Sequence, residues 1–174
     1  MFKKIEVSEI GNVFNLIGKD WMLISAGDEK NINTMTASWG TLGVMWNKNV
    51  AMIGVRPERY TYEFIEKNEY FTLSFFDEKH KKDLVYLGTK SGRDEDKIEK
   101  SNLNLVKGEN LPYFQEAKLV IKCKKIFRNE IGENNFLDSN INSWYDGPND
   151  IGGKHIFYIG EIVEVLSQDS IFIE

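Results

Sequence analysis

Short apolar segments that end at turn-forming residues limit the possible folds of this chain more than any other feature. WMLISAG (21–27) ends in Gly-Asp, and VAMIGV (50–55) runs into the turn RPER. Both segments are too short for a core helix and are bounded by residues that interrupt secondary structure, which favours buried strands. We expect these two strands to be neighbours in the core.

Three further segments have the composition of strands. YFTLSFF (70–76) is aromatic, and KLVIKCKKIF (118–127) alternates apolar residues with lysines, as a half-exposed strand does. HIFYIGEIVEVL (155–166) carries Gly160 in its middle, where a glycine often marks a bulge or a close approach by another group. These segments predict that strands dominate the fold.

Helices are predicted between the strands. TYEFIEKNE (61–69) has Thr61 placed to cap it, DEKHKKDLVYLG (77–88) runs from a capping Asp77 to Gly88, and a third short helix is expected near Asp94. Strands and helices do not alternate regularly, and no linker or repeat is present. The sequence therefore predicts one mainly β domain over residues 1–174, an antiparallel barrel or sandwich.

Charge and cysteine content exclude several classes of protein. The net charge of −5 gives no basic field, so we expect no nucleic-acid partner. Cys123 is the only cysteine, which rules out an intrachain disulfide or a cysteine-built metal site and is typical of a reducing compartment. No apolar run has the length of a membrane span or a signal peptide, so we expect a cytoplasmic protein without a membrane segment.

Three polar clusters each follow a predicted strand or begin a predicted helix: NTMTASWG (33–40), RPERYT (56–61) and SGRDEDK (91–97). In RPERYT, the Thr61 hydroxyl and the first N–H groups of the following helix form an anion site, and the arginines add positive charge. The serine, arginine and lysine of SGRDEDK can converge on the same anion. This combination suits a phosphate group.

Each cluster also has a purely structural interpretation. Arginines and lysines in turns usually pair with nearby carboxylates in solvent, which is the first choice for either charged cluster alone. NTMTASWG can be a barrel strand with its hydroxyls on a wet face and Met35, Ala37 and Trp39 in the core. His155 and the other tryptophans can likewise be structural. The joint occurrence of all three clusters favours a binding site.

The clusters and strands, taken in order, resemble a known family. NTMTASWG, VAMIGVRPERYTYEFI, YFTLSFF, LGTKSGRDEDKIEKSNL and HIFYIGEI are similar to segments of the FMN-binding split-barrel flavin reductases, in particular the flavoredoxin-like branch, from about residue 10 to about residue 166. The resemblance implies a six-stranded antiparallel split β-barrel with Greek-key topology and short flanking helices. It also implies a homodimer with one FMN per subunit near the interface.

The resemblance implies roles for individual residues as well. The strand from Asn33 to Trp39 would lie along the flavin ring, because small side chains let the backbone approach a flat ring closely. The turn before the first helix and Lys97 would bind the phosphate, and His155 would lie near the flavin face where a nicotinamide stacks. The implied cofactor-binding residues are Asn33, Met35, Thr36, Ala37, Ser38, Trp39, Arg56, Tyr60, Thr61, Ser91, Arg93 and Lys97, with His155 as the candidate catalytic residue and no metal site.

The function that the resemblance implies is that of a flavin-dependent oxidoreductase. NAD(P)H would pass a hydride to bound FMN, and the electrons would go on to a small acceptor or a redox partner protein. An alternative is an FMN-dependent electron carrier with little NAD(P)H turnover, and a third is a small barrel that binds protein or oligonucleotide through an open sheet. The glycine-rich stretch YDGPNDIGGK (145–154), directly before His155, is expected to cover or reshape the open face of the flavin.

Overall fold

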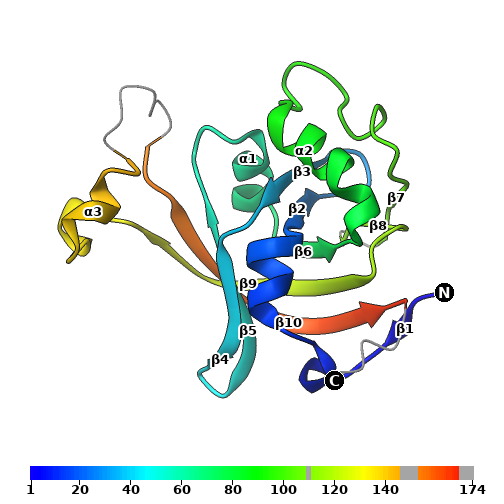
Figure 1. Ribbon diagram of the computed structural model, residues 1–174, viewed down its shortest axis with the longest axis horizontal. Coiled ribbons are helices and arrows are strands. Elements are labelled where there is room, and N and C mark those ends of the chain that lie inside the picture. Colours follow the sequence, from blue (N-terminus) through cyan, green and yellow to red (C-terminus); the bar gives the residue numbers. More distant parts are fainter. Residues whose placement is uncertain (109–110, 146–152, 169–174) are drawn as a thin grey trace.

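The computed structural model describes residues 1–108, 111–145 and 153–168, and its centre is a curled antiparallel sheet (Figure 1). Among these residues the strand order is β3-β2-β6-β9-β10-β5-β4, with β1 paired to β10. The strands are β1 (Lys3–Lys4), β2 (Met22–Gly27), β3 (Ile32–Ala37), β4 (Gly40–Met45), β5 (Lys48–Val55), β6 (Tyr70–Phe75), β9 (Leu119–Glu130) and β10 (Ile156–Ser167), and β7 (Leu105–Val106) pairs separately with β8 (Tyr113–Phe114).

The predicted mainly β, antiparallel fold is confirmed, with differences in detail. The main sheet has eight strands in the described ranges instead of six, because β4 and the two-residue β1 also join it. The prediction that segments 21–27 and 50–55 are neighbours is wrong: β2 pairs with β3 and β6, whereas β5 pairs with β4 and β10.

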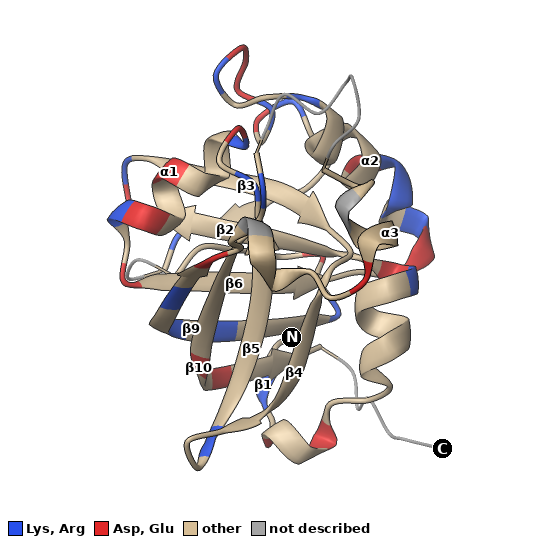
Figure 2. Cartoon of the chain, turned by 90° about the vertical axis from the view of Figure 1, so that its left-hand side faces the viewer, with Lys and Arg blue, Asp and Glu red and all other residues tan. Residues whose placement is uncertain are grey.

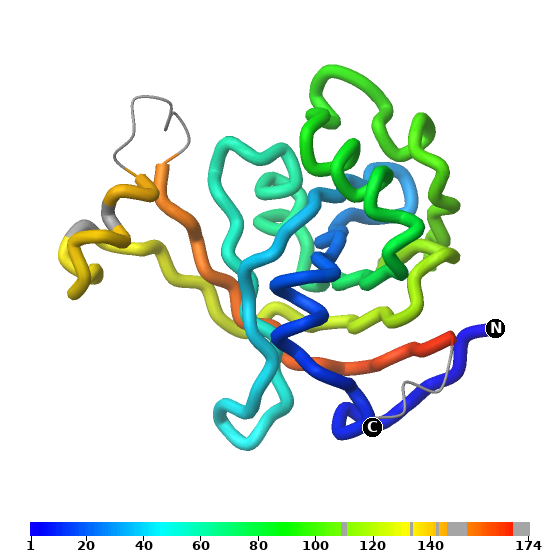
Figure 3. Tube along the Cα trace, viewed as in Figure 1, coloured from blue at the N-terminus to red at the C-terminus, as the bar shows by residue number. Residues whose placement is uncertain are grey.

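The two end strands of the sheet follow each other in the sequence, with only Ser38 and Trp39 between them. β3 pairs with β2, and β4 pairs with β5 from Gly40 opposite Ile53 onward. Figure 3 shows the chain passing directly from β3 into the β4–β5 hairpin. The sheet therefore curls until its ends meet at residues 38–39, a barrel that is split along this seam.

Two apolar clusters hold the sheet in shape. The inner faces of the strands enclose one cluster, with Ile53, Phe71 and Tyr158 at its centre. The second lies between the outer faces of β2, β6 and β9 and the helix α2 (Lys81–Thr89). Val120 belongs to this second cluster and is fully buried. The prediction of a half-exposed strand over 118–127 is therefore wrong in its first half, because the second apolar cluster covers the other face of the strand there.

The helices begin and end differently from the prediction. The helix α1 (Tyr60–Lys67) has Arg59 as its N-cap, so Thr61 lies in the first turn and does not cap it. The predicted helix 77–88 is a 3-10 turn, Glu78–His80, followed by α2. The remaining short elements are α3 (Ser139–Asn142), the 3-10 helices Val7–Glu9 and Glu133–Asn135, and the π-helix Asn15–Asp20.

The third predicted helix, near Asp94, is wrong: residues 92–100 form turns. The side chain of Asp96 accepts a hydrogen bond from the backbone N–H of Glu99, and Lys97 turns inward to backbone carbonyls. Such local side-chain bonds compete with a helix.

The predicted bulge at Gly160 is confirmed. The register between β10 and β9 shifts between Ile159 and Gly160, and a Cβ atom at this position would lie 2.7 Å from Cys123 Cβ and from the Phe71 ring. No helix in the described part of the chain is long and apolar enough to cross a membrane.

Candidate functional site

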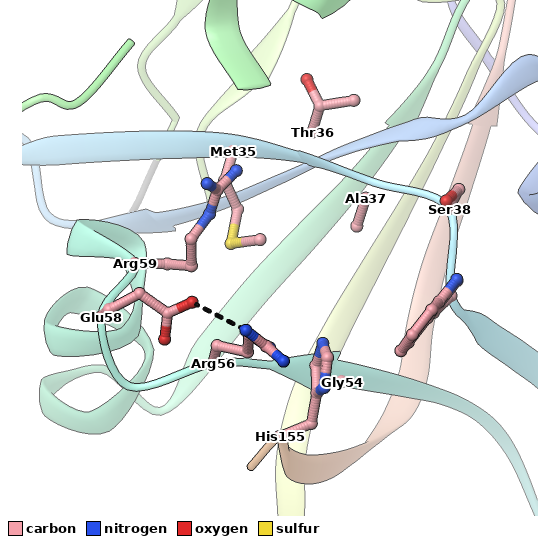
Figure 4. Close-up of a pocket in the computed structure, with 10 residues that line it drawn as sticks. Met35, Thr36, Ala37, Ser38, Gly54, Arg56, Glu58, Arg59 and His155 are labelled. Atoms are coloured by element: carbon pink, nitrogen blue, oxygen red, sulfur yellow. Dashed lines mark ion pairs between the residues drawn. The ribbon is translucent and has the colours of Figure 1, made fainter. Parts of the chain in front are cut away.

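A cavity of about 350 Å³ lies beside the seam, and Figure 4 shows its lining. We call it the seam cavity. Its walls come from the end of β3 with the seam residues, from the end of β5 with the following loop, and from the residue before β10. The lining residues are Met35, Thr36, Ala37, Ser38, Trp39, Gly54, Arg56, Glu58, Arg59 and His155.

The end of β3 lines this cavity with Met35, Thr36 and Ala37. β3 is an end strand, so within the described residues one of its edges is not paired with another strand. In Figure 4, Met35 and Ala37 point toward the loop that carries Arg56 to Arg59, and Thr36 points the other way. An unpaired strand edge offers alternating N–H and C=O groups, and the small Ala37 leaves them within reach of a flat heterocycle.

The hydroxyl groups of β3 hold the fold together. Thr36 Oγ1 donates to the Leu84 carbonyl of α2 at 2.5 Å, and Thr34 Oγ1 donates to the Ile24 carbonyl at 3.1 Å. Thr34 is fully buried, whereas Trp39 is 45 % exposed. The structural interpretation of NTMTASWG, with a wet threonine face and Trp39 in the core, is therefore wrong. Of its three apolar residues, Met35 is a buried member of the core cluster and Ala37 packs against that cluster.

Aromatic rings form one end of the seam cavity. The Trp39 and His155 ring centroids are 5.0 Å apart with the planes inclined at 36°, and Trp144 meets Trp39 edge-on at 5.5 Å. The Tyr145 hydroxyl lies 2.8 Å from His155 Nδ1. The contact of Trp144 with Trp39 was not predicted, since no local pattern connects the two residues, whereas Tyr145 begins the stretch 145–154 that was expected to cover or reshape the open face of the flavin. Of the glycine-rich stretch 145–154, residues 146–152 lie outside the described residues.

Arg56 lies at this aromatic end. Its Nη2 donates to the Trp144 carbonyl at 3.2 Å, its guanidinium carbon lies 5.2 Å from the centre of the Tyr145 ring, and Nη1 is 3.7 Å from Glu58. The structure therefore brings Arg56 to the seam cavity and not to the predicted phosphate end. Gly54 leaves room for the histidine, because a Cβ atom there would lie 3.3 Å from His155 Cδ2.

A second, smaller cavity of about 100 Å³ continues from the first. We call it the lysine cavity. The two cavities share Met35, Glu58 and Arg59. The remaining lining residues are Asn33, Tyr60, Thr61, Thr89, Lys90, Ser91, Gly92 and Lys97.

The first turn of α1 faces the lysine cavity. Thr61 is buried and accepts a hydrogen bond from Asn33 Nδ2 at 2.8 Å, which ties α1 to β3. The first N–H groups of a helix have no intrahelical partners and carry the positive end of the helix dipole. Together with the Arg59 guanidinium, which donates to the Gly88 carbonyl at 2.7 Å, this end of the site favours an anion.

Lys97 closes the lysine cavity from the other side. It is only 4 % exposed, and its ammonium group donates to the carbonyls of Leu87 at 2.7 Å and Lys90 at 2.9 Å. Burial, reinforced by repulsion from Arg59, lowers the pKa of Lys97 to about 8. An ammonium group has three N–H donors, so these two bonds leave one for a ligand.

Every predicted site residue except Arg93 lines one of the two cavities. Arg93 instead donates to the Glu58 carbonyl at 2.9 Å and to the Glu63 carboxylate at 2.6 Å, which braces its loop against α1. Gly92 was missed as a member of the site, whereas Arg59, one of the two RPERYT arginines expected to add positive charge to an anion site, lines both cavities. A Cβ atom at Gly92 would lie 2.3 Å from Asn33 Oδ1, so the close approach of this loop requires glycine. In the described ranges, no group of His, Cys, Asp or Glu side chains is arranged to hold a metal ion.

The two cavities together can hold one ligand with a flat ring and an anionic tail. The ring would lie along the unpaired edge of β3, and the tail would reach Lys97 and the start of α1.

A family model described as Flavin reductase like domain matches residues 15–172. An uncharacterized protein from Archaeoglobus fulgidus is 27 % identical over 144 residues, which cover 78 % of this chain and 80 % of that protein. Flavoredoxin from Methanosarcina acetivorans has a similar structure, with a TM-score of 0.66 and 24 % identity over 86 % of this chain and 69 % of that one. An FMN-binding domain of a flavin reductases-like enzyme from Shewanella baltica gives a TM-score of 0.69 and 18 % identity, covering 96 % and 77 % of the two chains. At these identities, the two solved structures establish the fold.

Proposed function

We propose that this chain, which belongs to the family described as Flavin reductase like domain, binds FMN and acts as a flavin-dependent oxidoreductase. The observation that carries the proposal is the continuity of the seam cavity with the lysine cavity. One has a free strand edge for a flat ring, and the other has a buried ammonium group and a helix N-terminus for a phosphate. The name of the similar Shewanella baltica domain supports the choice of FMN.

The protein's own residues would bind and orient the cofactor. Lys97, Thr61 and the first N–H groups of α1 would hold the phosphate, and the edge of β3 would hydrogen-bond the ring. Trp39 would exclude water from one end of the ring. FMN, when bound, supplies the hydride and electron chemistry, so no side chain has to act as a nucleophile.

NAD(P)H is the proposed electron donor, and a small molecule or a redox protein the proposed acceptor. The nicotinamide would pack near His155, where the rings of His155 and Trp39 suit contact with another flat ring. Trp144 packs against Trp39, and Tyr145 contacts His155, at the same end of the seam cavity. These contacts would leave less room for a nicotinamide, which favours the second candidate function, an electron carrier with little NAD(P)H turnover.

We further propose that the protein is cytoplasmic and forms a homodimer. Support for the homodimer comes from the outer face of β4, β5, β9 and β10. On this face Trp46 is 57 % and Phe127 41 % exposed, and the centres of their rings are 5.8 Å apart. Val50 and Ile159 are buried yet belong to neither core cluster, so this face carries an apolar layer of its own. In Figure 2, β4 and β5 are almost free of charged residues.

A double substitution tests the FMN proposal. We expect Thr61→Ala with Lys97→Ala to weaken FMN binding by about 2–5 kcal/mol, because charge-assisted hydrogen bonds to the phosphate are lost. Flavin fluorescence titration measures the dissociation constant. Riboflavin, which lacks the phosphate, is the matched control and should bind both proteins equally. An unchanged FMN dissociation constant in the variant would exclude this phosphate site.

Mixing the FMN-loaded protein with NADH or NADPH under anaerobic conditions separates the two candidate functions. Rapid loss of flavin absorbance indicates a reductase, whereas slow loss with either nucleotide, together with fast reduction by a chemical reductant, indicates a carrier. If the protein binds no flavin at all, the remaining hypothesis is the third one, a small barrel that binds protein or oligonucleotide through an open sheet.

A further inference from the structure

The amino group of Lys97 is held in one orientation by two carbonyl groups. Its Nζ lies 2.7 Å from the Leu87 oxygen and 2.9 Å from the Lys90 oxygen, and the almost fully buried side chain lines the lysine cavity. When the ammonium group loses a proton, the two remaining N–H groups can keep both carbonyls, and a lone pair takes the third position. The neutral amine would therefore direct its lone pair away from the two carbonyls, into the position that is left for a ligand.

The surroundings of Lys97 favour the neutral amine. Burial and repulsion from Arg59 lower the pKa of Lys97 to about 8, so at pH 8 about half of these side chains are neutral. Two other charged residues line the lysine cavity. Lys90 is also a cation, and the Glu58 carboxylate lies 3.7 Å from Arg56 Nη1, a competing positive charge. A nucleophilic amine is therefore present at a pH where an ordinary lysine is almost entirely protonated.

The acidic residues on the loop that carries Lys97 bind other groups. Glu95 Oε2 lies 2.5 Å from Lys100 Nζ, and Asp96 Oδ1 accepts the backbone N–H of Glu99 at 3.0 Å. Within the described ranges, no carboxylate contributes to the pKa of Lys97. The ammonium form of Lys97 therefore has no carboxylate partner in this part of the chain.

Lys125 has similar hydrogen bonds but does not line the lysine cavity. Its Nζ donates to the carbonyls of Ile65 at 2.5 Å and Glu66 at 3.2 Å, and burial lowers the pKa of Lys125 as well. Lys125 lines neither the lysine cavity nor the seam cavity. A comparison of the two lysines therefore separates the effect of the cavity from the effect of a lowered pKa.

The other groups of the lysine cavity select the kind of reagent that can reach Lys97. The first N–H groups of α1 and the Arg59 guanidinium favour an anion, and the hydrogen bond from Arg59 to the Gly88 carbonyl leaves further N–H donors for it. An acyl phosphate carries a phosphate group directly bonded to an activated carbonyl carbon. With the phosphate held at the start of α1, this carbon would lie next to the amine. The cavity volume of about 100 Å³ favours a short acyl group.

We propose that Lys97 is a modification site, at which a short-chain acyl phosphate transfers its acyl group to Nζ when the lysine cavity holds no cofactor. The Nζ lone pair forms a bond to the carbonyl carbon, the bond from this carbon to the phosphate oxygen breaks, and phosphate leaves with that electron pair. The extra proton on the nitrogen passes to water. The products are an uncharged amide at Lys97 and inorganic phosphate.

The proposal rests on the proposed phosphate site for FMN and adds a way to regulate it. The amide lacks the positive charge of the ammonium group, so a modified chain would bind the phosphate of FMN more weakly. Bound FMN would in turn shield Lys97 from the reagent, because both phosphates would occupy the lysine cavity.

Acetylation rates of two lysines in the unmodified chain test the proposal. The FMN-free protein is treated at about pH 8 with acetyl phosphate or with acetic anhydride, which carries no phosphate, and peptide mass spectrometry measures acetylation at Lys97 and Lys125. We expect acetyl phosphate to modify Lys97 faster than Lys125 on the order of tenfold, and acetic anhydride to show no such preference. Saturating FMN should slow the reaction of Lys97 on the order of tenfold, whereas riboflavin, which lacks the phosphate, should slow it much less. Neither flavin should change the rate at Lys125.

The outcomes separate this inference from the function on which it rests. If the protein binds FMN but acetyl phosphate modifies Lys97 no faster than Lys125, the modification site is overturned and the proposed function stands. An equal preference for Lys97 with acetic anhydride would also overturn the proposal, because the phosphate of the reagent would then play no part. Selective acetylation of Lys97 by acetyl phosphate that FMN does not slow would support the modification site and contradict the proposed position of FMN.

Discussion

Lys97 is the residue whose surroundings most narrowly limit what the lysine cavity can hold. It is almost fully buried, and burial together with the nearby Arg59 lowers its pKa to about 8. An anion beside the ammonium group would favour its charged form, so the pKa of Lys97 would rise when a phosphate binds. Binding of a phosphate ligand and protonation of Lys97 are therefore linked.

We expect the FMN dissociation constant to increase with pH above about 8. Below this pH Lys97 is already charged, and above it the neutral amine must take up a proton before it can pair with the phosphate. Titrations between about pH 7 and pH 10 measure the effect, a range in which the phosphate itself stays doubly charged. Riboflavin, without a phosphate, should show a flat profile. Parallel profiles for the two flavins would contradict the linkage.

In the unliganded protein the lowered pKa of Lys97 also makes the free energy of unfolding depend on pH. In the unfolded chain Lys97 has its ordinary pKa of 10.5, so between pH 8 and 10.5 the unfolded state binds a proton that the folded state lacks. The contribution of Lys97 to the free energy of unfolding therefore increases with pH in this window. The phosphate ligand would reverse this dependence.

Among the elements, those with a clear period could be predicted from the sequence and the others could not. β2, β5, β6, β9 and β10 lie within a few residues of their predicted ranges. β4 was missed because its residues are mostly exposed and form no pattern, and because the turn into β5 has Trp46 and Asn47 at positive φ without a glycine. The helix predicted near Asp94 does not form, because Lys97 turns inward and donates to backbone carbonyls. This is a tertiary interaction that the local sequence does not show.

The residues of the candidate site also divide into those that could be predicted from the sequence and those that could not. The residues of β3 and of the first turn of α1 could be predicted, because their types and order are those of a ligand-binding strand and turn. Arg56 meets Trp144 and Tyr145 only because these two residues, far from Arg56 in the sequence, lie beside the end of β5. A contact across so many residues leaves no signal in one sequence.

The β-bulge at Gly160 leads to a prediction about the packing of β10. We expect Gly160→Ala to lower the free energy of unfolding by about 1–3 kcal/mol, because the added methyl group would overlap Cys123 and Phe71 in a packed core. Gly43→Ala in β4 is the control, since a Cβ atom there would have nothing within 4 Å. Urea unfolding of both variants measures the difference, and equal midpoints would contradict the close packing at the bulge.

At the scale of the whole molecule, the outer face of β4, β5, β9 and β10 is the surface most suited to a second copy of the chain. We expect Trp46→Glu with Phe127→Glu to shift the protein toward a monomer, because two carboxylates would have to be buried in the interface. Sedimentation analysis measures the change. Val85→Glu, on the exposed side of α2, is the control for adding a charge at an exposed apolar position. A parent protein that sediments as a monomer would exclude the dimer.

The seam also determines how the protein behaves when its site is empty. An unpaired strand edge is a template to which a strand of another molecule can add, and natural proteins usually block such edges. Here residues of this end strand, Met35 to Ala37, line the seam cavity, so a ring bound along the strand would cover the same N–H and C=O groups that a foreign strand would seek. We expect heated protein without FMN to aggregate faster than the loaded protein, as light scattering would show, and riboflavin to protect where AMP does not. Equal aggregation in all four samples would mean that another surface starts the process. The bound ring would then occupy the place of a neighbouring strand at the edge of β3, and the solubility of the protein would depend on the supply of the cofactor.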